Sequence, residues 1–220
     1  MKKYLTLGIA VLAVNLIQAQ SSSSMLLSVY NKFAKVQSYK AKVEMTFTIP
    51  GVAMKPVIGM VEYKKPSEYR IKTQGISFMP KQSPLYAWTK LSDTTKYDAY
   101  EGGKETINGK ENIIINLIPH NDSDLVLAKF WIHPQSLLIS KSQITTKSNG
   151  TVTTMNTYGP QSSYALPDKI TFTVDVSKFK IPKALAADFT SSSKKNSNKD
   201  FSGQGIITMT LNAYEVIPTK

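Results

Sequence analysis

Few residues of this chain could carry acid–base or nucleophilic chemistry, because it contains two histidines and no cysteine. His120 lies in the run Pro-His-Asn-Asp-Ser-Asp, where it could form a metal site together with Asp122 and Asp124. Asn, Asp and Ser are also the residues that a turn needs, so we interpret this run as a turn. His133 precedes a proline between two predicted strands, which favours a hairpin residue over a general base.

Sequence motifs of enzymes are missing as well. The chain has no GxSxG elbow, no HExxH helix and no phosphate-binding glycine loop. Its carboxylates are sparse and unpaired near apolar runs, so no acid–base pair is indicated. The sequence predicts a protein that is not an enzyme and has neither a metal nor a cofactor. A hydrolase of an envelope substrate, built on a β-barrel, is the alternative, and it would need clustered polar groups in its cavity.

The first residues have the pattern of a secretory signal peptide. Two lysines follow Met1, an apolar run covers 5–17, and Ala19 offers a small residue for cleavage. We therefore expect a signal peptide at 1–19 and one domain at 20–220, free in the periplasm. Without cysteine, neither a lipid anchor nor a disulfide is expected. The net charge of +12 is spread over scattered lysines, which indicates a solvated basic surface and no nucleic-acid partner.

Hydrophobic periodicity predicts one helix followed by many strands. Apolar residues recur at helical spacing over 25–37, and strict alternation follows from Ala41 to Ile49. Asn108-Gly109 is a strong hairpin signal. Further strands are expected at 57–63, 68–73, 86–89, 96–100, 113–118, 125–132, 138–146, 151–158, 169–176 and 206–216. The segment 178–205 breaks this rhythm, and its Ser-, Lys- and Asn-rich part at 190–199 is typical of a mobile tract.

The fold class is therefore α+β with mainly antiparallel β-structure, as a sandwich or barrel of about ten strands. Its apolar strand faces form either an ordinary core or the concave wall of a cavity for an apolar ligand, covered by the helix and by 178–205. Periodicity does not choose between the two. The residues expected to face inward are Met45, Phe47, Met60, Tyr63, Ile71, Trp88, Ile115, Leu117, Phe130, Ile132, Ile139, Met155, Phe172 and Met209.

The order of these features resembles the outer-membrane lipoprotein carrier and sorting proteins of the LolA/LolB type. The resemblance rests on the amphipathic helix, the long alternating strand, Lys-Lys-Pro at 64–66 before Tyr-Arg, Phe-Trp-Ile-His at 130–133, and Leu-Pro-Asp-Lys-Ile at 166–170. It covers nearly all of the chain after residue 19.

The resemblance implies a half-open β-barrel with a lid over an apolar cavity, and a periplasmic carrier of lipoprotein acyl chains or another lipid. It further implies an inner-membrane donor and an outer-membrane acceptor as partners, and we expect a monomer. The lid-latch position of the family corresponds to Lys65, which lacks the forked hydrogen bonding of arginine. A lipid-sensing or scaffold module of the same fold, or a purely structural envelope protein with a filled interior, are the alternatives.

Overall fold

A computed structural model describes residues 22–50, 55–65, 68–73, 76–78, 91–121, 124–148, 150–175 and 203–220. Within these ranges, one helix covers 22–33 and precedes all of the strands. The eleven strands are β1 (Val36–Thr48), β2 (Val57–Lys64), β3 (Glu68–Thr73), β4 (Ile76–Phe78), β5 (Tyr97–Ile107), β6 (Lys110–Pro119), β7 (Leu125–His133), β8 (Leu138–Thr146), β9 (Gly150–Thr157), β10 (Lys169–Asp175) and β11 (Gln204–Pro218). Short 3₁₀ turns lie at Thr94–Lys96 and Pro160–Tyr164.

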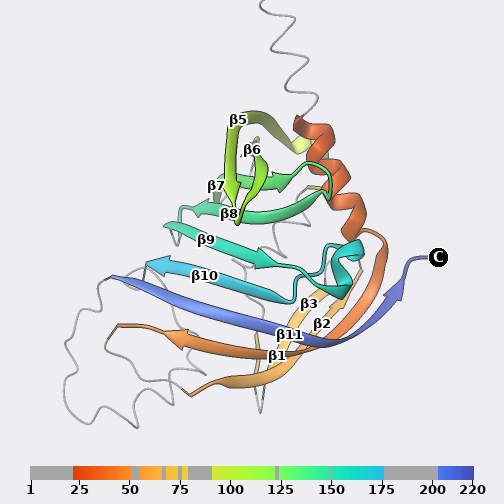
Figure 1. The fold of residues 1–220 in the computed structure, drawn as a ribbon, viewed down its shortest axis with the longest axis vertical. Helices are drawn as coiled ribbons and strands as arrows, with labels where there is room; N and C mark the ends of the chain where they lie inside the picture. The colour runs from red at the N-terminus through yellow and green to blue at the C-terminus, as the bar shows by residue number, and fades with distance from the viewer. Residues whose placement is uncertain are drawn as a thin grey trace, which may run out of the picture.

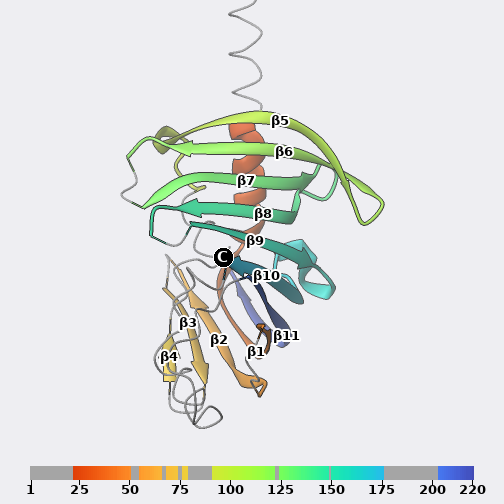
Figure 2. The ribbon, with the colours of Figure 1, turned by 90° about the vertical axis from the view of Figure 1, so that its left-hand side faces the viewer.

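All of these strands form one antiparallel sheet in the order β4-β3-β2-β1-β11-β10-β9-β8-β7-β6-β5. The last strand, β11, is inserted between β1 and β10, so the two ends of the chain meet in the middle of the sheet. The sheet is open, because β4 and β5 are its edges and do not pair with each other. Figure 2 shows that the strands turn from nearly horizontal in β5–β9 to steeply inclined in β1–β3, so the sheet is strongly twisted.

The hairpin predicted at Asn108-Gly109 is confirmed. These two residues alone join β5 to β6, and Ile107 pairs with Lys110. Their φ angles are 50° and 75°, the left-handed values that a two-residue turn between twisted strands requires. The sequence therefore fixes the register of this hairpin through its turn residues.

The sheet has an apolar inner face and a polar outer face, because buried and exposed residues alternate along its strands, as in β1. Tyr39, Ala41, Val43 and Met45 are buried, and the residues between them are exposed. Alternation of this kind places one side of every strand in the core. The buried side chains of the other strands join those of β1 in one hydrophobic cluster.

The helix 22–33 packs on the inner face (Figure 1), where Leu26, Val29 and Phe33 are buried in the same cluster. Sequence periodicity extended this helix to Gln37, but Val36 already begins β1 by pairing with Pro218. A helix of these twelve residues is about 18 Å long, whereas eleven strands span about 48 Å. The helix can therefore cover only part of the inner face.

Several expectations fall on residues outside the described ranges. They are the signal peptide at 1–19, a strand at 86–89 with Trp88, and almost all of the segment 178–205 expected to form a lid. Within the described ranges, no helix is both long and apolar enough to cross a membrane.

Candidate functional site

The inner face of the sheet collects most of the residues that the sequence assigned to a cavity. Phe47 packs against the edge of the hydrophobic cluster. The buried members of that cluster are Met45, Tyr63, Ile71, Ile115, Leu117, Phe130, Ile132, Ile139, Phe172 and Met209. They form cross-strand neighbours, such as Met45 with Met209 and Ile115 with Phe130. Their role as ligand-binding residues stays a prediction.

Met60 and Met155 do not share this face. Met60 lies opposite exposed Lys42 on β1, and its neighbour Val61 carries the buried position of β2. Met155 lies opposite Lys141, and its neighbour Thr154 is the fully buried residue of β9. Alternation along a strand then places both methionines on the outer face, where they are half-buried.

An aromatic cluster fills the inner face at the point where the helix ends. Tyr39, Tyr63 and Tyr69 are direct cross-strand neighbours on β1, β2 and β3. The Tyr39 ring lies 5.6 Å from that of Tyr63 and 5.7 Å from that of Tyr214, and Phe33 of the helix lies 4.9 Å from Tyr63. Of this cluster, only Tyr63 was among the residues expected to face inward, although alternating tyrosines on neighbouring strands were the signal that could have predicted the cluster.

Burial leaves the phenols of this cluster neutral. It raises the pKa of Tyr63 to about 12 and holds the pKa of Tyr39 and of Tyr69 well above the ordinary value. Tyr214 donates a hydrogen bond to the Pro167 carbonyl over 2.6 Å. The Tyr69 hydroxyl is buried, and its side-chain hydrogen bond with Tyr39 contributes to the raised pKa of Tyr39.

Lys65 joins three parts of the chain beside this cluster. Its ammonium group donates hydrogen bonds to the Ala34 carbonyl, just after the helix, and to Thr219 Oγ1 over 2.7 Å. The backbone N–H of Thr219 in turn donates to the Lys35 carbonyl over 2.7 Å. The cation thus stands where helix carbonyls are unpaired and where the helix dipole favours positive charge. The contacts of Lys65 tie the helix to the C-terminal strand.

We expect Lys65→Met to weaken this junction. Hydrogen bonds from a charged donor are worth about 1.5–3 kcal/mol when buried, and partial exposure lowers this to about 1–2 kcal/mol. Chemical denaturation measures the loss, and amide hydrogen exchange should speed up in the helix 22–33. Lys64→Met is the matched control, because Lys64 is exposed. Equal stability of the two variants would contradict this assignment.

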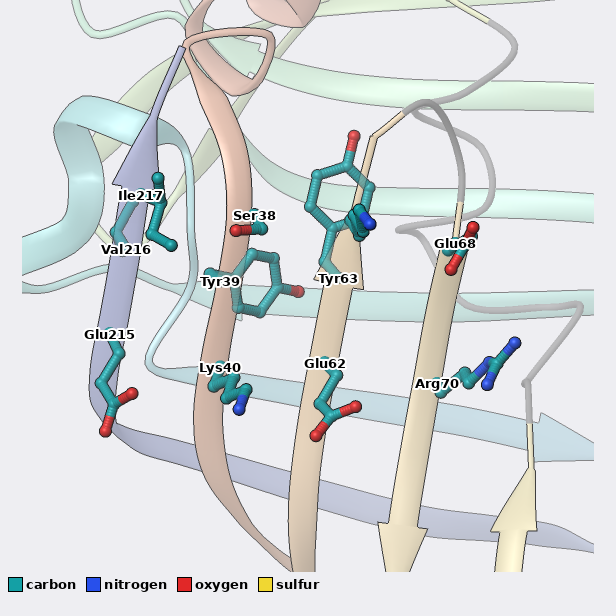
Figure 3. Close-up of a pocket in the computed structure, with 11 residues that line it drawn as sticks. Ser38, Tyr39, Lys40, Glu62, Tyr63, Glu68, Arg70, Glu215, Val216 and Ile217 are labelled. Atoms are coloured by element: carbon teal, nitrogen blue, oxygen red, sulfur yellow. The ribbon is translucent and has the colours of Figure 1, made fainter.

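A groove of about 460 Å³ lies across the ends of four strands (Figure 3). Its lining residues are Ser38, Tyr39, Lys40, Glu62, Tyr63, Lys64, Glu68, Arg70, Glu215, Val216 and Ile217. Glu215, Lys40, Glu62 and Arg70 are successive cross-strand neighbours, so charges of opposite sign alternate along this row. Such pairs stabilise strand pairing. Because the groove carries three cations and three carboxylates, it has no preference for an ion of either sign.

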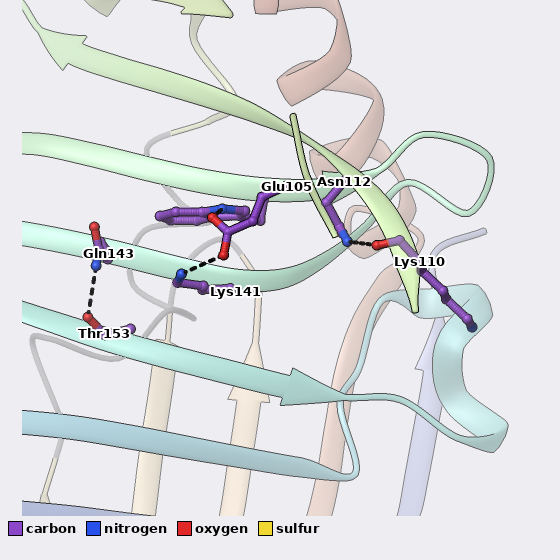
Figure 4. A network of polar contacts seen from close by, with 7 residues as sticks. Glu105, Lys110, Asn112, Lys141, Gln143 and Thr153 are labelled. Atoms are coloured by element: carbon purple, nitrogen blue, oxygen red, sulfur yellow. Dashed lines mark hydrogen bonds and ion pairs between the residues drawn. The ribbon is translucent and has the colours of Figure 1, made fainter. Parts of the chain in front are cut away.

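On the outer face of β5–β9 a polar network surrounds Trp131. Figure 4 shows two of its members, Glu105 and Lys141. The indole N–H donates to Glu105 over 2.5 Å, and Lys141 Nζ lies 4.2 Å from the ring centroid and 3.3 Å from the same carboxylate. A hydrogen bond from Trp131 is the main cause that lowers the pKa of Glu105. The network covers the indole, which is 3% exposed, with a cation–π contact and a satisfied hydrogen bond on the outer side of the sheet. Its role is structural.

The two histidines serve turns, as the sequence indicated. His120 contacts Asp98 over 3.1 Å through Nε2 and the Thr95 carbonyl through Nδ1. The hydrogen bond with Asp98 is the main reason why the pKa of His120 is raised. Asp124 instead accepts hydrogen bonds from Ser148. His133 Nδ1 accepts the backbone N–H of Ser136 in the β7–β8 turn. In the part of the chain that the structure describes, no group of three His, Asp or Glu side chains could hold a metal ion.

Comparison with solved structures supports a known fold for this open, twisted sheet and the helix 22–33 that packs on it. A putative outer membrane lipoprotein-sorting protein domain from Vibrio parahaemolyticus is similar at a TM-score of 0.58 and 9% identity, over 90% of this chain and 93% of that chain. A LolA superfamily protein from Nitrosomonas europaea gives a TM-score of 0.56 at 12% identity, over 92% of this chain and 95% of that chain. A DUF1329 family protein from Desulfovibrio piger ATCC 29098 gives a TM-score of 0.56 at 7% identity, over 90% of this chain and 93% of that chain.

No protein-family model matches the sequence, and no curated protein matches it. At identities of 7–12% the similarity concerns the fold and not the activity. The resemblance that the sequence motifs indicated is therefore confirmed at the level of structure. This chain has the fold of LolA superfamily and lipoprotein-sorting proteins.

Proposed function

We propose that this protein is a periplasmic carrier that binds the acyl chains of lipoproteins, or of another lipid, on the inner face of its sheet and moves them toward the outer membrane. The observation that carries the proposal is the asymmetry of the sheet. Its inner face is apolar on nearly every strand, and one helix of about 18 Å can cover only part of it. The fold that it shares with lipoprotein-sorting proteins supports the same role.

The chemistry of the inner face suits reversible binding of acyl chains. Each methylene removed from water contributes about 0.8 kcal/mol, so an acyl chain has a strong tendency to enter an apolar site. Met45 and Met209 are neighbours across β1 and β11, and their flexible side chains can adapt to chains of different shape. The proposal includes no catalytic step and no cofactor.

Native mass spectrometry tests the proposal. The chain without residues 1–19 is purified without detergent, mixed with a diacylated lipopeptide and measured against its apo mass. We expect a 1:1 complex or an already bound lipid that solvent extraction releases. Thr46→Glu changes an exposed position of β1 and should bind normally, whereas Met45→Glu at the neighbouring buried position should not. A clean apo mass that ignores the lipopeptide would overturn the proposal.

A further inference from the structure

The groove on the outer face is built from two rows of side chains that run across β11, β1, β2 and β3 (Figure 3). The first row is Glu215, Lys40, Glu62 and Arg70, and the second is Ile217, Ser38, Lys64 and Glu68. Neighbouring strands lie about 4.8 Å apart. The groove therefore presents cations and carboxylates side by side at the spacing of the strands.

These neighbouring charges do not close ion pairs with one another. All of the lining residues lie in the described ranges, and no two of them form an ion pair together. Glu62 pairs over 2.7 Å with Lys72, which is not a lining residue. Cross-strand pairing would be served best by closed pairs. Two couples of exposed, opposite charges are thus left open to a ligand that carries both signs: Lys40 with Glu215, and Lys64 with Glu68.

Spacing distinguishes between ligands that carry both signs. An extended peptide presents the side chains of one face about 6.6–6.8 Å apart, which is wider than the distance between neighbouring strands. In ethanolamine phosphate, a two-carbon linker holds the ammonium group close to the phosphate, at about one strand spacing. Lysine and arginine donate to phosphate, and a carboxylate accepts from a primary ammonium group. A groove of about 460 Å³ has room for such a head group.

An apolar side chain adjoins these charges. Ile217 is 60% exposed and stands at the end of the second row, beside Ser38 on β1. At a bilayer surface, apolar side chains enter the boundary between head groups and acyl chains, and charged side chains meet the head groups. A soluble phosphate compound would offer Ile217 no such contact. The combination therefore favours a lipid that is part of a bilayer.

We infer that the groove docks the protein on a membrane by binding the zwitterionic head groups of phospholipids that carry a primary amine. Lys40, Lys64 and Arg70 donate to phosphate oxygens, and the ammonium groups donate to Glu68 and Glu215. This docking uses charged side chains of the outer face. It goes beyond the proposed binding of acyl chains on the inner face and does not depend on it.

Vesicle flotation tests the docking with the chain without residues 1–19. One set of vesicles is phosphatidylcholine, and the other contains equal parts of phosphatidylcholine and phosphatidylethanolamine. Both sets are neutral, so the net positive charge of the protein favours neither. Choline has no N–H to donate to a carboxylate. We therefore expect wild type to bind the mixed vesicles about tenfold more tightly.

A groove variant and a matched control locate the effect. The groove variant removes two cations and two carboxylates, so its net charge is unchanged: Lys40→Met, Lys64→Met, Glu68→Gln and Glu215→Gln. It should lose the preference for mixed vesicles. The control, Lys104→Met with Glu111→Gln, removes an exposed ion pair of 2.9 Å beside the β5–β6 turn and should keep the preference. Equal binding of wild type to both vesicles, or an unchanged preference in the groove variant, would overturn the inference.

Native mass spectrometry with the diacylated lipopeptide separates this inference from the proposed function. The groove variant should bind the lipopeptide as wild type does, because none of the four replaced side chains belongs to the hydrophobic cluster. If wild type binds the lipopeptide but shows no preference between the vesicles, the docking fails and the carrier proposal stands. If wild type prefers the mixed vesicles but ignores the lipopeptide, the carrier proposal fails and the docking stands.

Discussion

Replacing Phe130 by alanine should destabilise the protein by about 3–5 kcal/mol, because it empties a large volume on the inner face of β7. Phe130 is 2% exposed and lies between Ile115 on β6 and Ser142 on β8. Its removal loses the transfer free energy of the ring and leaves a cavity that a tightly paired sheet cannot close. Domains are typically stable by about 5–15 kcal/mol, so this single change would remove a large share.

Urea denaturation followed by circular dichroism measures the effect. Val126→Ala on the same strand is the matched control, because Val126 is 45% exposed, and it should change stability by less than about 0.5 kcal/mol. A small loss for Phe130→Ala would mean that the interior here is loosely packed. In that case the inner face would already contain space for a ligand, and the carrier proposal would gain support from the failed prediction.

Local patterns of the sequence predicted the two faces of the sheet well where the alternation is unbroken. In β1 the apolar positions 41, 43 and 45 all turn out to be buried. Met60 and Met155 were misplaced because a methionine is apolar enough to suggest the core on either face, and one residue of register reverses its side. Val36 satisfied the helical spacing and the strand alternation equally, so only its pairing with Pro218 decides where the helix stops.

Contacts between distant residues were beyond sequence reasoning. The resemblance placed the lid-latch position at Lys65, but it gave no sign that the ammonium group contacts Thr219, which lies 154 residues further along the chain. This contact exists because β11 returns to pair with β1, and no short motif encodes that return. The same insertion brings Tyr214 beside Tyr39, so the aromatic cluster also depends on topology more than on local pattern.

Alkaline pH should unfold the protein, because its buried tyrosines resist ionisation. Burial raises the pKa of Tyr63 and of Tyr97 to about 12, against about 10 in an unfolded chain. Between pH 10 and 12 the unfolded chain loses protons that the folded chain keeps, so the free energy of unfolding falls as the pH rises. By pH 12 each of these tyrosines lowers the free energy of unfolding by about 2 kcal/mol, and the two together lower it by roughly 4–5 kcal/mol.

Absorbance at 295 nm reports phenol ionisation, and far-UV circular dichroism reports the fold. We expect the buried tyrosines to ionise together with the loss of structure above pH 11. Tyr63→Phe removes one of the two groups and should shift the unfolding midpoint to higher pH. Tyr100→Phe, at a position that is 44% exposed on the outer face, should leave the midpoint unchanged. If all 11 tyrosines ionise near pH 10 while the sheet stays folded, solvent reaches the inner face freely, and a sealed aromatic cluster is the wrong description of it.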